Sequence, residues 1–111
     1  MEEYMLLVRD YDYKDATPEE MQRRMEAYRP WMEKMTAEGR YKGGAPLEPG
    51  VGRLVKGGKV LTDGPFLESK EIVGGYVIVT AESFDQAAAF AVECPLSRHC
   101  DLEVRRVAKM M

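Results

Sequence analysis

The residues best suited to chemistry lie in one polar segment and at one isolated histidine. Residues 62–71 read TDGPFLESKE and carry three carboxylates, at Asp63, Glu68 and Glu71. Two carboxylates that share a cleft separate their pKa values and can divide acid and base work between them. His99 is the only histidine, so a mechanism that needs an imidazole near neutral pH must use it. Asp63 and His99 are therefore the candidate catalytic residues.

These side chains also have structural explanations, and the sequence leaves both open. Asp63 begins an Asp-Gly-Pro turn, in which a short carboxylate accepts hydrogen bonds from nearby backbone N–H groups. The alternating charges from Glu68 to Glu71 suit a solvated loop or an ion pair between subunits. His99 follows the second expected helix, so the alternative to a catalytic role is a histidine in a surface turn.

A second group of residues could shape a ligand cavity. Glycine costs roughly 0.5–1 kcal/mol in a strand interior relative to alanine. The pair Gly74-Gly75 therefore indicates the close approach of another backbone, a bulge or the floor of a cavity. Tyr76 could offer its hydroxyl to that space, and Phe66 could pack as an anchor or form an aromatic wall. The candidate ligand-binding residues are Phe66, Glu68, Glu71, Gly74, Gly75 and Tyr76.

Three possible metal ligands lie near the end of the chain. Cys94, His99 and Cys100 are one ligand short of a tetrahedral structural zinc site. Cys100 stands beside His99, but no third group that would orient the pair for nucleophilic catalysis is evident. We expect two free thiols, no metal site and no cofactor.

The spacing of apolar side chains predicts the strands that must position these residues. Residues 4–9 and 72–80 are apolar on both faces, which predicts strands covered on both sides. Shorter strands are expected at 41–45 and 102–107. The glycine pair 57–58 between alternating segments at 51–56 and 59–62 is a hairpin signal.

Two helices have recognisable first turns. Thr17 precedes a proline and is followed by Glu20 at the third helical position, which is a capping box; Gly39 should end that helix. Ser83 and Gln86 form the same pattern before an alanine-rich helix that ends at a Cys-Pro pair. Methionines recur at helical spacing along the first helix and are expected to pack in the core: Met21, Met25, Met32 and Met35.

This order of elements predicts a fold and a partner. A β-α-β unit, a hairpin insert and a second β-α-β unit give an α+β, ferredoxin-like fold with an antiparallel sheet. The doubly apolar strands at 4–9 and 72–80 are then central, and the helices can cover only one face of them. We expect a second copy to cover the other face, which makes the protein a homodimer through its sheet faces.

Composition narrows the class of protein. The 111 residues fit one domain, residues 1–111, and 16 basic against 19 acidic residues give a net charge of −3. The sequence contains no basic stripe of the kind that indicates nucleic-acid binding. No apolar run approaches the roughly 18 residues of a membrane span, and the acidic start differs from a signal peptide. We therefore expect a cytoplasmic protein that binds neither membrane nor nucleic acid.

The run TDGPFLESKEIVGGY at residues 62–76 resembles the signature of the YCII-related family, in its DGPF subgroup. The matching positions are Asp63, Gly64, Pro65, Phe66, Glu68, Lys70, Glu71, Gly74, Gly75 and Tyr76. The resemblance extends over the whole chain, although Arg98-His99-Cys100 replaces the small residues of many relatives. It implies a dimeric α/β barrel built from two ferredoxin-like domains. It also implies a possible enzyme, since a distant member removes chloride from a hydroquinone, or a regulatory role, since members occur beside sigma-factor genes.

Two functions follow as hypotheses. The first is a homodimer with a small-molecule cleft near the DGPF run and a binding or regulatory role. The alternative is a cofactor-independent acid–base enzyme that acts on a small, possibly aromatic, substrate. The first is favoured because dedicated catalytic groups are sparse in the sequence.

Overall fold

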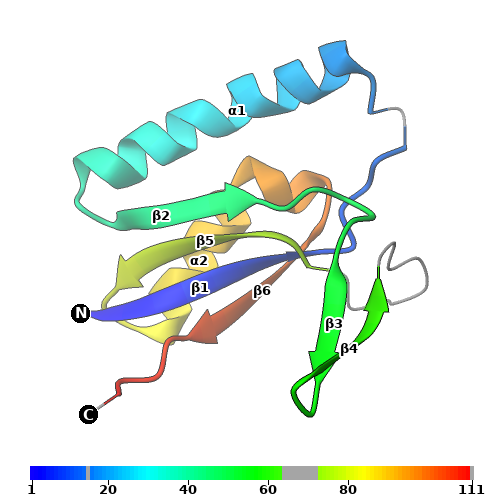
Figure 1. The fold of residues 1–111 in the computed structure, drawn as a ribbon. Helices are drawn as coiled ribbons and strands as arrows, with labels where there is room; N and C mark the ends of the chain where they lie inside the picture. Colours follow the sequence, from blue (N-terminus) through cyan, green and yellow to red (C-terminus); the bar gives the residue numbers. More distant parts are fainter. Residues whose placement is uncertain (15, 64–72, 111) are drawn as a thin grey trace.

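The described residues form one antiparallel sheet, two helices and a separate hairpin (Figure 1). The computed structural model describes residues 1–14, 16–63 and 73–110, without the side chains of residues 61–63. In chain order, the described elements are β1 (Glu2–Arg9), α1 (Pro18–Ala37), β2 (Tyr41–Pro46), β3 (Arg53–Lys56), β4 (Lys59–Asp63), β5 (Val73–Ala81), α2 (Phe84–Glu93), the 3₁₀ turn η1 (Pro95–Arg98) and β6 (Asp101–Arg106).

The main sheet has the strand order β2-β5-β1-β6, and every neighbouring pair is antiparallel. This is the order of a ferredoxin-like fold, so the predicted fold class is confirmed. The two strands predicted to be central, β1 and β5, are central, with Leu6 opposite Val77 and Leu7 opposite Tyr76. Because side chains alternate along a strand, this register places the two members of each pair on the same face of the sheet.

Both helices begin at the predicted caps. The Thr17 hydroxyl accepts a hydrogen bond from the Glu20 backbone N–H at 3.1 Å, and Ser83 does the same for Gln86 at 3.1 Å. In a capping box, the side chain at the third helical position also accepts a hydrogen bond from the N-cap backbone N–H, and here both of these side chains have other partners. The Gln86 side chain accepts from the N–H of Glu82 at 2.6 Å, and the Glu20 carboxylate pairs with arginines. Neither helix in the described ranges is long and apolar enough to cross a membrane.

The core lies between the helices and one face of the sheet. Tyr4 and Leu6 from β1 and Val79 from β5 are buried there, together with Trp31 and Met35 of α1. The indole N–H of Trp31 donates to the carbonyl oxygen of Phe90 at 3.2 Å, which joins α1 to α2.

The methionine prediction holds for only part of α1. Met35 is buried and Met32 packs against the core, but Met21 and Met25 are exposed. The helix covers the sheet closely only along its second half. Its first half overhangs a hollow, to which these two side chains contribute.

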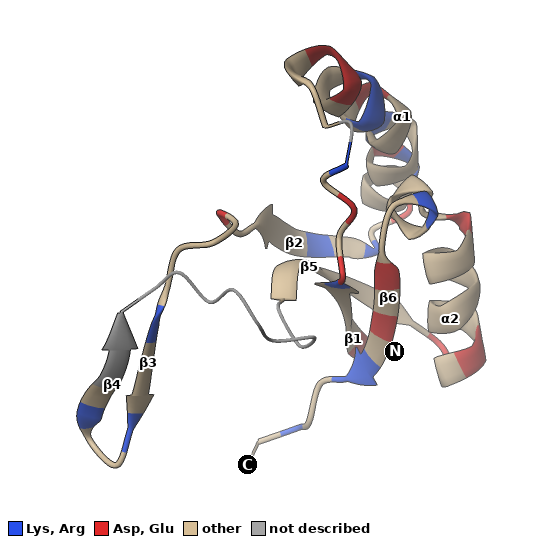
Figure 2. Ribbon diagram, turned by 90° about the vertical axis from the view of Figure 1, so that its right-hand side faces the viewer, with Lys and Arg blue, Asp and Glu red and all other residues tan. Residues whose placement is uncertain are grey.

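Among the described elements, both helices lie on one face of the sheet and none lies on the other (Figure 2). Met5, Leu7, Tyr76 and Ile78 of the central strands lie on this open face and are half-buried within the chain. They alternate with the buried side chains of the same strands. The sequence pattern therefore places apolar residues on a face that the described part of the chain leaves open.

The hairpin of β3 and β4, the hairpin arm, stands on the same side as the open face (Figure 2). Gly57 and Gly58 join its strands with φ of 60° and 77°, as the two central positions of a type I′ turn require. Leu54, Val55 and Val60 are exposed on the arm. The predicted hairpin is thus present, as a sheet of its own with an apolar surface.

Candidate functional site

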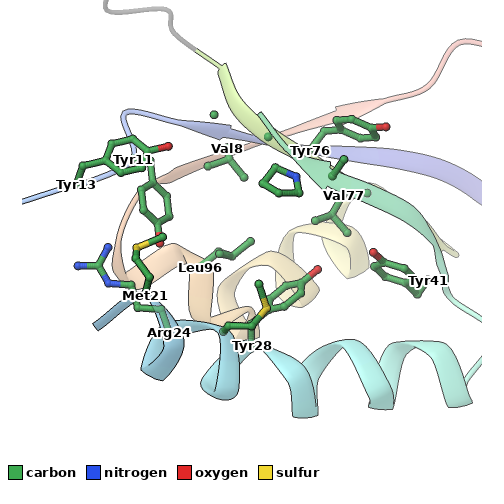
Figure 3. Close-up of a pocket in the computed structure, with 16 residues that line it drawn as sticks. Val8, Tyr11, Tyr13, Met21, Arg24, Tyr28, Tyr41, Tyr76, Val77 and Leu96 are labelled. Atoms are coloured by element: carbon green, nitrogen blue, oxygen red, sulfur yellow. The ribbon is translucent and has the colours of Figure 1, made fainter. Parts of the chain in front are cut away.

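A cavity of about 210 Å³ lies between the first half of α1 and the sheet (Figure 3). Met21, Met25 and Tyr28 of α1 form one wall. Val8 of β1 and Val77 of β5 belong to the opposite wall, on the face of the sheet that the helices cover. The lining is mainly aromatic and aliphatic, which is typical of small-molecule sites.

One end of the cavity is closed by the segment that joins β1 to α1. The rings of Tyr11 and Tyr13 pack with centroids 4.8 Å apart, and both residues line the cavity. The Arg24 guanidinium lies 5.5 Å from the centroid of the Tyr11 ring. It donates to the Asp12 carbonyl oxygen at 2.7 Å and pairs with Glu20 at 2.8 Å. Arg24 therefore ties this segment to α1 and holds the end wall in place.

The charges at this end are already matched. Hydrogen bonds from Arg24, and then from Arg23, lower the pKa of Glu20. Hydrogen bonding to Tyr11, and then to Glu20, raises the pKa of Arg24. Desolvation, and then the neighbouring Tyr11, raises the pKa of Tyr13. At neutral pH this end accordingly presents a paired cation and the neutral phenol of Tyr13 to the cavity.

The opposite end of the cavity carries two further phenols. Tyr28 reaches in from α1 and Tyr41 from β2, with their hydroxyls facing each other (Figure 3). The Tyr28 ring also packs beside Trp31, with centroids 5.6 Å apart. Burial is the largest cause that raises the pKa of Tyr28, followed by the neighbouring Tyr41. Both hydroxyls contribute hydrogen-bonding capacity to a wall that is otherwise apolar.

Glycines allow β2 and β5 to approach closely beside the cavity. A Cβ on Gly44 would lie 2.6 Å from the Tyr76 carbonyl oxygen, and one on Gly75 would lie 2.9 Å from the Ala45 carbonyl oxygen. Gly74 is different, because a Cβ there would meet only side chains, at 3.6 Å or more. Close backbone approach, one of the explanations offered for the glycine pair, thus applies at Gly75. All three glycines line the cavity.

The sequence-predicted site residues are distributed unevenly around this cavity. Gly74, Gly75 and Tyr76 border it, but the Tyr76 side chain is directed to the open face, so its hydroxyl does not enter. Asp63 ends β4 on the hairpin arm, and its side chain lies outside the described part of the chain. Phe66, Glu68 and Glu71 also lie outside the described residues.

His99 does not line the cavity but lies beside Tyr11, which does. Its ring centroid is 6.5 Å from that of Tyr11, and its carbonyl oxygen accepts a hydrogen bond from the Asp12 N–H at 2.7 Å. The histidine backbone therefore anchors the same segment that Arg24 ties to α1. Its imidazole is therefore near one end of the cavity without belonging to the lining.

The two cysteines are free, as expected. Burial raises the pKa of each thiol to about 11, so both stay protonated at neutral pH. The Cys100 thiol donates to the Leu96 carbonyl oxygen at 3.1 Å. Within the described ranges, no group of three His, Cys, Asp or Glu side chains could hold a metal ion.

Sequence reasoning identified part of this lining and missed the rest. It singled out Gly74 and Gly75, which border the cavity, but not Tyr11, Tyr13, Arg24 or Tyr41. These residues belong to different elements, and no spacing in the sequence connects them. The frequency of tyrosine was the available signal: four of the six tyrosines place their side chains around one cavity.

These features define the class: a ferredoxin-like α+β domain with an aromatic cavity between its first helix and its sheet. The chain belongs to the YCII-related family, since the model of the YCII-related domain matches residues 3–111. No curated protein matches it.

Among solved structures, the fold is similar to that of 5-chloro-2-hydroxyhydroquinone dehydrochlorinase (TftG) from Burkholderia phenoliruptrix AC1100, in complex with 2,5-dihydroxybenzoquinone. The TM-score is 0.53 and the sequence identity 18%, over 97% of this chain and 95% of that one. At this identity the likeness shows the fold.

Proposed function

We propose that this protein binds a small, mainly apolar ligand with a single ring in the cavity beneath α1, in a binding or regulatory role. The observation that carries the proposal is the cavity itself, with its aromatic lining and its volume of about 210 Å³. An apolar cavity of about 150 Å³ in another protein admits benzene, so this volume suits one ring with a few substituents. The paired charges at Arg24 and Glu20 favour a ligand without a strong charge of its own.

We also propose that the chain belongs to the DGPF subgroup of the family, whose signature the run at residues 62–76 resembles. The run at residues 62–71 leads directly into β5, whose Gly74 and Gly75 border the cavity. We propose that Phe66, Glu68 and Glu71 contribute to the rim of the same site. Two free thiols suit a reducing compartment, which supports a cytoplasmic protein.

A cavity-blocking variant tests the binding proposal. Met21→Trp would place an indole in the mouth of the cavity, whereas Gln22→Trp adds the same group at the neighbouring exposed position, which does not line it. Isothermal titration with single-ring compounds should show saturable binding to the wild type and to Gln22→Trp, and at least tenfold weaker binding to Met21→Trp. Absence of saturable binding to the wild type by any such compound would overturn the proposal.

The second candidate function is a cofactor-independent acid–base enzyme that acts on a small aromatic substrate. The likeness to a dehydrochlorinase solved with a one-ring quinone favours it, as does the imidazole of His99 close to the cavity end at Tyr11. Asp63 and His99 would be its catalytic residues. Asp63→Asn and His99→Gln should then each abolish turnover and leave ligand affinity within about threefold of the wild type. Unchanged turnover in both variants would rule this candidate out.

We also propose that two copies pair through their open faces. Met5, Leu7 and Ile78 leave apolar surface exposed there, and the hairpin arm extends on the same side with Val55 and Val60 exposed. An isolated two-stranded hairpin is only marginally stable in water, so a partner that covers the arm would stabilise it.

Sedimentation velocity at micromolar concentration tests the pairing. The wild type should sediment with twice the mass of the chain. Ile78→Lys should give single chains with unchanged circular dichroism, since a lysine on the paired face would be buried without a partner charge. Val92→Lys, at an exposed position on α2, is the matched control and should stay paired. A wild type that sediments as single chains would contradict the proposal.

A further inference from the structure

The two phenols at the α1–β2 end of the cavity form a distinct polar group. Tyr28 and Tyr41 direct their hydroxyls toward each other, while Arg24 lies at the opposite end (Figure 3). We infer that this phenol pair receives a neutral acceptor oxygen of the ligand, such as a carbonyl group attached to a small ring. The inference rests on the binding function proposed above and names the class of ligand for that site.

Packing around the pair explains why its hydroxyls are available there. Tyr41 lies opposite Val79 in the register of β2 and β5, which directs its ring to the helix side of the sheet. A Cβ on Gly44 would come within 3.3 Å of the Tyr41 hydroxyl, so the glycine leaves space beside that oxygen. The Tyr28 ring is held by its contact with Trp31. Both hydroxyls are therefore positioned by the fold before any ligand arrives.

The two hydroxyl hydrogens of Tyr28 and Tyr41 determine what the pair can donate to a ligand. Each neutral phenol has one hydrogen to donate, and when one hydroxyl donates to the other, the second still has its hydrogen. Val77 and Leu96, which line the cavity near the pair, carry apolar side chains without a hydrogen-bond acceptor (Figure 3). A ligand oxygen at this point would accept that hydrogen, or both hydrogens if the two hydroxyls rotate toward it.

The protonation state of Tyr28 favours a neutral ligand oxygen. The pKa of Tyr28 is raised well above its ordinary value of 10.0, first by burial and then by Tyr41, so this phenol remains a neutral donor at physiological pH. A carboxylate at this end would leave water without a partner cation, because the Arg24 guanidinium points to the other end of the cavity (Figure 3) and is already paired with Glu20. A carbonyl oxygen loses much less on leaving water and uses the same donors.

Two ligands of matched shape test the inference. Acetophenone and isopropylbenzene differ mainly in a carbonyl oxygen that replaces a methyl group. Both should bind the wild type by isothermal titration or ligand-observed NMR. Tyr28→Phe and Tyr41→Phe should each weaken acetophenone about threefold to tenfold, the effect of one hydrogen bond, and leave isopropylbenzene within twofold. The double variant should lose little more than either single variant, because the two hydroxyls act as a unit.

Tyr4→Phe is the control, because Tyr4 is buried outside the cavity lining, and it should not change the affinity for either compound. If both compounds bind the wild type and the Tyr28 and Tyr41 variants leave both affinities within twofold, the phenol-pair inference is overturned and the proposed binding function stands. If neither compound nor any other single-ring compound binds the wild type, the binding function itself fails. Thermal melts of each variant confirm that the fold is intact.

Discussion

The two faces of the central strands show how one alternating pattern can serve two purposes. Leu6 and Leu7 are neighbours in β1, yet Leu6 is fully buried against the helices and Leu7 lies half-buried on the open face. The helix side holds the core and the cavity. The open face and the hairpin arm expose apolar surface. Hydrophobic character alone therefore does not decide whether a side chain lies in the core or on an open face. The element that covers each face of the sheet decides this.

The largest expected effect comes from truncating this neighbouring pair. Leu6→Ala should lower the free energy of unfolding by about 2–5 kcal/mol, because it leaves a cavity in a packed core. Leu7→Ala should cost about 1 kcal/mol or less within one chain, because the site is already partly solvated. Urea unfolding at concentrations where sedimentation shows single chains measures both. Equal losses for the two variants would mean that the faces are equivalent within the chain.

A smaller effect is expected where β2 and β5 approach on the helix side. Gly75→Ala should lower the free energy of unfolding by about 1–3 kcal/mol, because its methyl group would press on the Ala45 carbonyl. Gly74→Ala is the matched neighbour, with ordinary contacts only, and should change stability by less than about 0.5 kcal/mol. Thermal unfolding of both variants decides the point. A Gly75→Ala protein as stable as the wild type would show that the two strands can separate freely.

The smallest effect concerns the ion pair on the open face. Glu103 accepts a hydrogen bond from Arg9 and lies 3.3 Å from Arg105. The hydrogen bond from Arg9 is the largest cause that lowers the pKa of Glu103 below its ordinary value of 4.5. Since the folded chain holds the ionised form more tightly, this stabilisation is present above about pH 4.5 and is lost as the pH falls through the lowered pKa.

Glu103→Gln measures that contribution. The urea midpoint of the wild type should exceed that of the variant near neutral pH, and the difference should shrink as the pH falls below about 4.5 and through the lowered pKa of Glu103. The effect should be small, because surface ion pairs contribute little. A difference between the two proteins that stays constant across this range would show that the carboxylate does not stabilise the fold.

Local signals in the sequence predicted much of the fold. The apolar alternation of β1 and β5 identified the central strands, Gly57 and Gly58 predicted the hairpin, and Thr17 and Ser83 marked the helix starts. Each of these signals acts over a few residues, since turns, caps and strand faces are set by near neighbours. The methionine stripe was only half right, because helical spacing indicates a face but not how closely another element packs on it.

The cavity was less accessible to such reasoning. The glycines of β5 pointed to this region, but for Gly75 the reason for glycine is the backbone of β2 rather than a ligand. Tyr11 and Arg24 become an end wall only because the chain before α1 folds back onto that helix. His99, singled out for its chemistry, supports the same segment with its backbone.

The sequence by itself determined the antiparallel α+β fold and the apolar character of both faces of β1 and β5, because period-2 alternation and turn chemistry are local properties. It also contained the run at residues 62–76 that predicted the YCII-related family, and the family model matches residues 3–111. Only the tertiary structure decided which face the helices cover and that Tyr28 and Tyr41 meet across a cavity. The physical reason is that a cavity is bounded by side chains from several elements, and their distances depend on how helix and sheet pack rather than on any spacing along the chain.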